Sequence, residues 1–142
     1  MEPGRAVAEG YYSSSERPPV PVVRLNVYTP SGRRGTTVEA RVDTGFSGTL
    51  LLSIEEYLRL GLHLYEDAEK IEGLVAGGYR VELRVSRCIV ELGGFREACE
   101  VYTTVFARRS LLGRGLLDRF TALLDAPRGV VRLEAPPAAQ KR

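Results

Sequence analysis

The stretch D-T-G-F-S-G at 43–48 places one carboxylate where an apolar segment runs into a glycine-rich bend. A carboxylate held at the end of a strand can act as a general acid or base when its neighbours fix its position and charge. Thr44 can lock the loop with its hydroxyl, and Gly45 permits a tight turn and a close backbone approach. The tripeptide alone also fits an ordinary Asx turn, so its chemistry depends on the surrounding elements.

His63 and two cysteines are the other side chains that could do chemistry. A nucleophilic triad needs a serine or cysteine that the histidine activates, and no pattern here supplies one, so we expect a surface or packing role for His63. Cys88 and Cys99 are too few for a structural zinc site and lack the Cys-x-x-Cys spacing of a redox motif. We therefore expect no metal site and no cofactor.

Strands must position the carboxylate, and the segments on either side of it have strand character. Segments 20–29 and 36–43 flank a turn of Pro, Ser and Gly, which predicts a hairpin. A short apolar strand over 49–53 follows the bend. A helix then begins at Ser53, with a glutamate three residues on to complete a capping box, and ends at Gly61.

A second hairpin is predicted over 70–85, where two alternating segments flank the Ala-Gly-Gly tip at 76–78. The apolar residues of its second arm change parity after Val85, which predicts a bulge or bend near Ser86 or Arg87.

A third hairpin is centred on Gly93 and Gly94. If these two glycines are the whole turn, position n faces position 187 minus n, so Cys88 faces Cys99 and an ion pair of Glu91 and Arg96 forms. The two thiols could then form a cross-strand disulfide or remain buried and free, and the sequence favours neither. Further strands and a short helix follow over 110–134. About nine short strands with one or two short helices predict an all-β fold, a closed or nearly closed barrel.

This order of elements resembles the retropepsin-like aspartic peptidases, and it looks closest to the single-domain prokaryotic group whose motif reads D-T-G-F-S-G. The resemblance rests on the hexapeptide at 43–48, the glycine-tipped hairpin and the Leu-Leu-Gly element at 111–113 before a short helix. It covers about residues 20–135 and implies a retropepsin-like β-barrel.

The resemblance implies a role for each matching residue. Asp43 would be the catalytic aspartate, the Thr44 hydroxyl would tie two active-site loops together across a dimer, and the Gly45 backbone would lie under the substrate. The remaining implied positions are the rest of the active-site loop (Phe46, Ser47, Gly48), the flap that closes over a bound peptide (Ala76, Gly77, Gly78) and the support beside the Asp43 loop (Leu111, Leu112, Gly113).

Hydrolysis by this mechanism needs two carboxylates that share one proton, and the chain holds a single copy of the motif. A second copy of the chain must supply the other Asp43 through a two-fold axis. The resemblance therefore implies a homodimeric aspartic endopeptidase that acts on extended polypeptide without a cofactor. Two alternatives stay open: a non-catalytic module that binds a peptide or partner on the same barrel, and a nucleic-acid-binding β-barrel.

The 142 residues are enough for one compact domain, which we place at 20–135 between flexible tails at 1–19 and 136–142. Twenty basic and eighteen acidic residues leave a net charge of +2 without a dense basic block, so we expect no nucleic-acid partner. No segment is apolar for the roughly 18 residues of a membrane helix, and the first residues lack the order of a secretory signal, so we expect a cytoplasmic protein. The scarcity of Asn, Gln and Met is typical of a thermophile.

Overall fold

A computed structural model of the chain describes residues 5–66, 71–74, 78 and 80–135. In chain order its elements are β1 (Arg5–Ser13), β2 (Val20–Tyr28), β3 (Gly35–Val42), β4 (Leu50–Leu51), α1 (Ile54–Leu60), the 3₁₀ helix η1 (Leu62–Tyr65), β5 (Ile71–Leu74), β6 (Arg80–Leu92), β7 (Phe95–Thr103), β8 (Ser110–Leu112), α2 (Arg114–Leu117), β9 (Thr121–Asp125) and β10 (Val130–Ala135).

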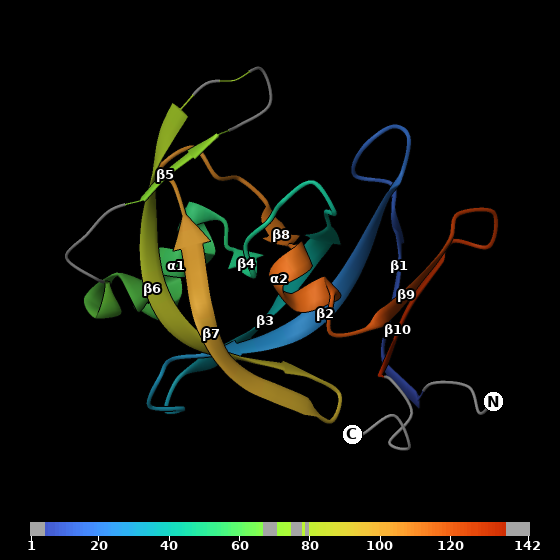
Figure 1. The fold of residues 1–142 in the computed structure, drawn as a ribbon, viewed down its shortest axis with the longest axis horizontal. Coiled ribbons are helices and arrows are strands. Elements are labelled where there is room, and N and C mark those ends of the chain that lie inside the picture. The colour runs from blue at the N-terminus through green and yellow to red at the C-terminus, as the bar shows by residue number, and fades with distance from the viewer. Residues whose placement is uncertain (1–4, 67–70, 75–77, 79, 136–142) are drawn as a thin grey trace.

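The strands form one sheet in the order β5-β6-β7-β4-β8-β3-β2-β1-β10-β9. A further antiparallel pairing between β2 and β6, which includes Val27 opposite Val90, joins two strands that are distant in this order. This pairing closes β6, β7, β4, β8, β3 and β2 into a ring, while β1, β10 and β9 extend from it to one side (Figure 1). The predicted all-β, nearly closed barrel with short helices is confirmed.

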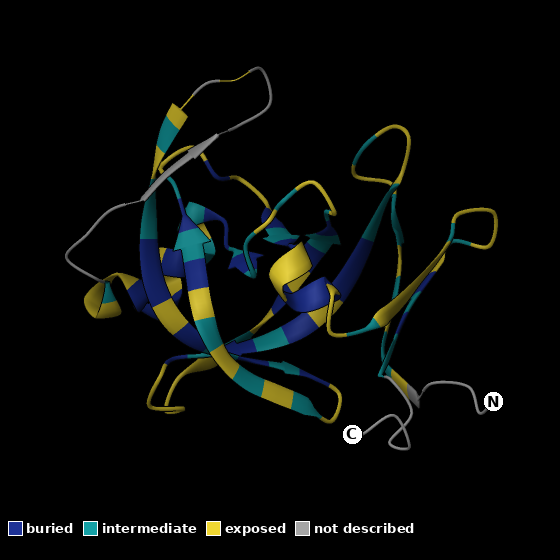
Figure 2. Cartoon of the chain, viewed as in Figure 1, coloured by how far each residue is buried: buried dark blue, intermediate teal, exposed yellow. Residues whose placement is uncertain are grey.

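The hydrophobic core fills the ring because the strands alternate between buried and exposed residues. In β2, Val23, Leu25 and Val27 are buried, and in β3 Val38 and Ala40 face them (Figure 2). Helix α1 contributes Tyr57 and Leu60 to the same core, and α2 contributes Leu116 and Leu117.

The first and third predicted hairpins are confirmed in their strands and pairing. β2 and β3 pair antiparallel from Val22 opposite Arg41 to Tyr28 opposite Gly35. β6 and β7 pair in the predicted register, and the Arg96 guanidinium lies 3.0 Å from the Glu91 carboxylate. Local turn geometry fixes this register, because two glycines leave only one way to pair the flanking alternating strands.

Of the two irregularities predicted near Ser86 or Arg87, a bulge or a bend, the bulge was wrong. β6 pairs with β7 without a register shift from Arg84 to Leu92. The parity changes because both Val85 and Ser86 are buried, with η1 packed on this part of the strand. The Ser86 hydroxyl donates a hydrogen bond to the carbonyl oxygen of Leu62 at 2.7 Å, so the polar side chain is satisfied inside the protein.

The flexible tail predicted over 1–19 was wrong for Arg5–Ser13, which forms β1. This strand pairs with both β10 and β2 and packs side chains including Val7 and Tyr12 against the core. Its register shifts between Ala6 and Ala8, and this irregularity weakens the alternation that would have signalled a strand. The ordered sheet therefore begins before residue 20, whereas the predicted tail at 136–142 lies outside the described residues.

Candidate active site

Asp43 directly follows β3, at the point where β3 runs parallel to β8. The pair Val42 and Leu112 ends the ladder, and the Asp43 amide then donates to the Leu112 carbonyl oxygen at 3.0 Å. The Gly45 amide donates to Asp43 Oδ1 at 2.9 Å. These two bonds hold the main chain and the carboxylate of Asp43, which is half-buried, while Thr44 and Gly45 are exposed.

Residues 113–115 support the Asp43 loop through three backbone hydrogen bonds. The Gly113 amide donates to the Thr49 carbonyl oxygen at 2.9 Å, and the Arg114 amide donates to that of Phe46 at 2.8 Å. The Gly115 amide donates to the Gly48 carbonyl oxygen at 3.0 Å. The structure thus brings the Leu-Leu-Gly segment at 111–113 against the loop at 43–48, which are far apart in the sequence.

Phe46 explains the second glycine of the motif. Its ring packs edge-on against Tyr102, with ring centroids 6.1 Å apart, and lies over the backbone of Gly48 and Gly113. A Cβ on Gly48 would lie 2.5 Å from Phe46 Cζ, and one on Gly113 would lie 2.6 Å from Phe46 Cδ2. The ring therefore leaves no room for a side chain at Gly48, and at Gly113 the ring and the Gly48 carbonyl oxygen together leave none. Ser47, between Phe46 and Gly48, is exposed.

The hairpin expected to form a flap is described in part. β5 and β6 pair antiparallel, as predicted, and Gly78 is exposed with a positive φ of 80°. Ala76 and Gly77 lie outside the described residues. A groove of about 480 Å³ lies between β6 and the loop that joins β7 to β8, where Val105 and Phe106 are 64% and 79% exposed.

Cys88 and Cys99 face each other across β6 and β7 with free thiols and a sulfur to sulfur distance of 3.9 Å. The hydrogen bond between the thiols and the burial of Cys88 raise the pKa of its thiol. A buried, protonated thiol is a poor nucleophile. The pair belongs to the barrel wall and is not part of the Asp43 loop.

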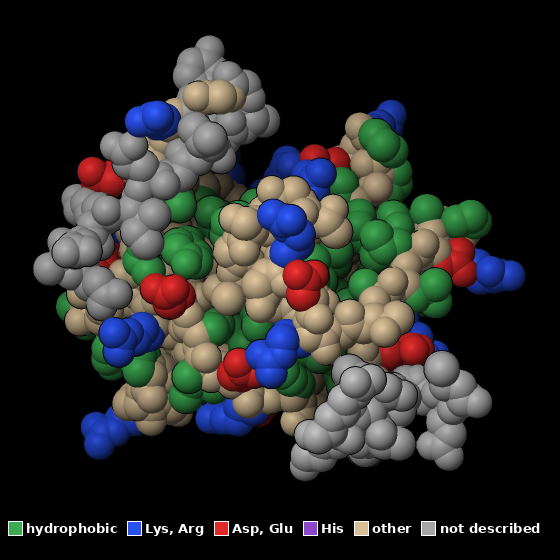
Figure 3. Space-filling model, viewed as in Figure 1, with side chains coloured by type: hydrophobic (Ala, Val, Ile, Leu, Met, Phe, Trp, Pro, Cys, Tyr) green, Lys and Arg blue, Asp and Glu red, His purple; other side chains and the backbone are tan. Residues whose placement is uncertain are grey.

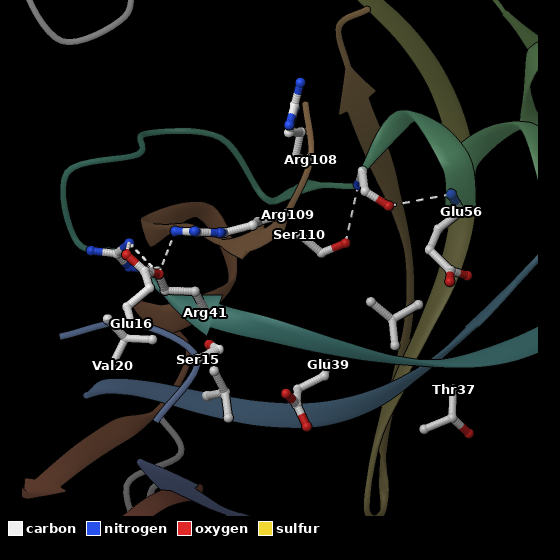
Figure 4. A pocket seen from close by; sticks show the side chains of 13 residues that line it. Ser15, Glu16, Val20, Thr37, Glu39, Arg41, Glu56, Arg108, Arg109 and Ser110 are labelled. Carbon is white, nitrogen blue, oxygen red and sulfur yellow. Dashed lines mark hydrogen bonds and ion pairs between the residues drawn. The ribbon is translucent and has the colours of Figure 1, made fainter. Parts of the chain in front are cut away.

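A charged pocket beside the Asp43 loop was missed by the sequence analysis. Glu16, Arg41 and Arg109 meet there, from three separate segments (Figure 4). The available signal was position: Arg41 stands two residues before Asp43 and Arg109 two residues before Leu111, so each arginine precedes one of the two segments expected to meet at the site. Nothing in the sequence places Glu16 with them.

Other features of the surface are less specific. On the face shown in Figure 3, acidic and basic side chains are interspersed, without a large patch of one sign. Within the described part of the chain, no three His, Cys, Asp or Glu side chains are grouped so that they could hold a metal ion. His63 is exposed on η1. None of the helices in the described ranges has the length and apolar character needed to cross a membrane.

Known structures share the fold of this chain. A retropepsin-like aspartic protease from Rickettsia conorii aligns with a TM-score of 0.59 at 18% identity, over 95% of this chain and 97% of its own. EIAV protease, in complex with the inhibitor HBY-793, aligns with a TM-score of 0.53 at 21% identity, over 75% of this chain and 90% of its own. No protein-family model and no curated protein sequence matches the chain significantly. The chain therefore has the retropepsin-like aspartic protease fold.

Proposed function

We propose that the protein is an aspartic endopeptidase that hydrolyses peptide bonds of extended polypeptides as a homodimer. The observation that carries this proposal is the position of Asp43. It lies in an Asp-Thr-Gly turn that hydrogen bonds to β8 and is supported by residues 113–115, within a retropepsin-like fold. The two aligned proteases support the same activity for this chain.

The chemistry requires a second carboxylate, because one aspartate cannot serve as base and acid in the same step. Two carboxyl groups at hydrogen-bonding distance hold one proton between them, since two like charges so close cannot both form. We propose that Asp43 of a second copy supplies the partner through a two-fold contact. Thr44 is exposed in the single chain, which leaves its hydroxyl accessible to that copy.

In the proposed reaction the ionised carboxylate removes a proton from a water molecule, whose oxygen attacks the carbonyl carbon of the scissile peptide. The protonated carboxyl group of the other Asp43 gives its proton to the carbonyl oxygen. The tetrahedral diol then collapses as the C–N bond breaks, and a proton passes to the leaving nitrogen. No covalent intermediate with the protein forms.

The surrounding residues hold the reacting group in place. The Gly45 amide at 2.9 Å from Asp43 Oδ1 fixes one carboxylate oxygen and leaves the other for water or for the partner carboxyl group. The backbone bonds from residues 113–115 keep the loop from shifting when a substrate binds.

The variant Asp43→Asn tests the proposal because it keeps the side chain's shape and removes the ionisable group. We expect its kcat/KM on an unfolded polypeptide to fall by roughly a thousandfold or more, with unchanged thermal stability. Asp118→Asn, at the exposed residue that caps the C-terminus of α2, is the matched control and should cleave like the wild type. Undiminished cleavage by Asp43→Asn would reject the assignment. A stable dimer that cleaves nothing between pH 3 and 7 would favour a binding module instead.

A further inference from the structure

Two arginines and one glutamate meet in a pocket of about 390 Å³. Glu16, in the loop between β1 and β2, places its Oε2 3.1 Å from Arg41 Nη1, and the same oxygen pairs with Arg109. Figure 4 shows the side chains of Arg41 and Arg109 converging on this carboxylate, while Arg108 points away from it. One carboxylate therefore lies between two guanidinium groups.

The strand register places this pocket beside Asp43. Arg41 pairs with Leu111 of the parallel strand β8, and the buried Val42 separates Arg41 from Asp43. Residues two apart on extended backbone project to the same side, so Arg41 and Asp43 share the face that points away from the core. Arg109 stands two residues before Leu111, in the loop that leads into β8, and its guanidinium meets that of Arg41 at Glu16. A polypeptide that reaches Asp43 along this face passes the two arginines.

The other carboxylates that line the pocket have cations of their own. Glu39 pairs with Arg24 at 3.6 Å, and Glu56 pairs with Arg59 at 3.0 Å. Neither Arg24 nor Arg59 lines the pocket. Among the described residues, the other carboxylates that line the pocket thus pair with arginines outside it. Removal of the Glu16 side chain would therefore leave the guanidinium groups of Arg41 and Arg109 without their carboxylate partner.

Glu16 is also unlike its neighbours in the loop. Its side chain is 24% exposed, whereas Ser15 and Arg17 on either side are exposed. The loop thus turns one side chain, an acidic one, into the pocket. A carboxylate held by guanidinium groups is the same chemistry that would bind Asp or Glu of a peptide.

We propose that Arg41 and Arg109 form a subsite for an acidic side chain of the polypeptide substrate, and that Glu16 occupies this subsite in the free protein. This inference rests on the proposed function, because Asp43 is taken as the centre of cleavage. An incoming Asp or Glu displaces Glu16 and takes over its charge-assisted hydrogen bonds. The loop between β1 and β2 is then both a competitor for acidic substrates and a wall of the pocket.

The first test measures binding, so that it does not depend on cleavage. Two pools of eight-residue synthetic peptides are randomised alike, except that Asn and Gln in one pool replace Asp and Glu in the other. Both are offered to the Asp43→Asn protein, and bound peptides are quantified by mass spectrometry. We expect the acidic pool to bind about five to ten times more tightly, since charge-assisted hydrogen bonds are about twice as strong as neutral ones.

Three further variants of the Asp43→Asn protein separate a subsite from a structural ion pair. The pair Arg41→Gln and Arg109→Gln should remove the preference for the acidic pool. Arg128→Gln is the matched control, because Arg128 is an exposed arginine with its own partner Asp125 at 3.0 Å, and it should keep the preference. Glu16→Gln should bind the acidic pool a few times more tightly, because it no longer competes. A merely structural Glu16 would leave the preference unchanged.

The second test digests both pools with the wild-type protein and maps the cut positions. Asp43-dependent cleavage with Asp or Glu enriched at one fixed distance from the cut supports the subsite. Such cleavage without that enrichment overturns the subsite and leaves the proposed function intact. Absence of cleavage together with selective binding of the acidic pool contradicts the proposed function and keeps the subsite. The inference is overturned if the Asp43→Asn protein and its Glu16→Gln form both bind the two pools equally, or if neither protein binds either pool. This outcome does not depend on whether the arginine variants fold.

Discussion

Gly113 lies where the backbone before α2 crosses the loop that carries Asp43. A Cβ at this position would be 2.2 Å from the Gly48 carbonyl oxygen and 2.6 Å from the Phe46 ring. Both neighbours are held by other contacts, since Gly48 bonds to Gly115 and Phe46 packs against Tyr102. Even one methyl group therefore has to push the Asp43 loop out of place.

Gly113→Ala is expected to lower the free energy of unfolding by roughly 1–3 kcal/mol, the usual cost of forcing an extra carbon into packed structure. Urea denaturation followed by circular dichroism measures this change. Gly94→Ala is the matched control, because no atom lies within 4 Å of the Cβ position at Gly94. Equal destabilisation by the two substitutions would contradict the packing described for the loop.

Glu91 gives the barrel a contribution to stability that depends on pH. Hydrogen bonds from the Asn26 side-chain amide, which has the larger effect, and from the Arg96 guanidinium hold the pKa of the Glu91 carboxyl group below its usual range. A carboxyl group with a lowered pKa in the folded state stabilises the protein above its unfolded pKa, about 4.3, and the effect is lost as the pH falls through the folded pKa.

Glu91→Gln should therefore be less stable than the wild type near pH 7, and the difference should shrink as the pH is lowered from about 5 to about 3. Thermal unfolding at a series of pH values measures the difference. A gap between the two proteins that stays constant over this range would contradict the assigned pKa shift.

Helix α1 is fixed to the barrel by the residue that caps its N-terminus. The Ser53 hydroxyl oxygen accepts a hydrogen bond from the Glu56 amide at 3.3 Å, and the Ser53 amide donates to Ser110 Oγ at 3.1 Å. Ser53 therefore caps the helix and also connects it to β8, the strand beside Asp43. The predicted capping serine is confirmed, and Gly61 ends the helix in the left-handed conformation as expected.

Ser53→Ala is expected to lower the free energy of unfolding by about 1 kcal/mol, because the Glu56 amide loses its partner. Chemical denaturation provides the measurement. Ser14→Ala, in the exposed loop between β1 and β2, is the control and should change stability little. A Ser53→Ala protein as stable as the control would show that the cap contributes nothing.

The sheet ends in an apolar edge. β9 is the last strand in the sheet order, and its Leu123 and Leu124 are 52% and 44% exposed. An exposed edge strand with apolar side chains is a site where another chain can pair. In the proposed homodimer this edge would pair with the second copy. The contact would then be made by β1, β10 and β9, the strands that extend from the ring to one side.

Leu124→Glu is expected to raise the dissociation constant of the dimer by about tenfold or more, because it places a charge on the apolar edge. Sedimentation velocity over a range of concentrations measures this constant, and cleavage per chain should fall in parallel. Leu64→Glu is the matched control, since Leu64 is an exposed leucine on η1, away from this edge. A wild-type protein that stays a single chain at all concentrations would contradict the shared active site.

The sequence by itself determined the features that depend on near neighbours. Alternation and the Gly93-Gly94 turn set the β6–β7 register, including Cys88 opposite Cys99, and a serine and a glycine set the ends of α1. The motif at 43–48 and the residues that follow β8 were recognisable for the same reason, because each is a short stretch whose backbone geometry restricts its residue types.

Only the tertiary structure decided which distant segments meet. It paired Arg5–Ser13 with β10 and β2, and it closed the ring through the pairing of β2 with β6. It also buried Ser86, whose hydroxyl bonds to the Leu62 carbonyl oxygen, where the parity of β6 changes. It also brought Glu16 between Arg41 and Arg109. Pairings between segments far apart in the sequence depend on the packing of the whole core, so a local pattern of residues does not predict them.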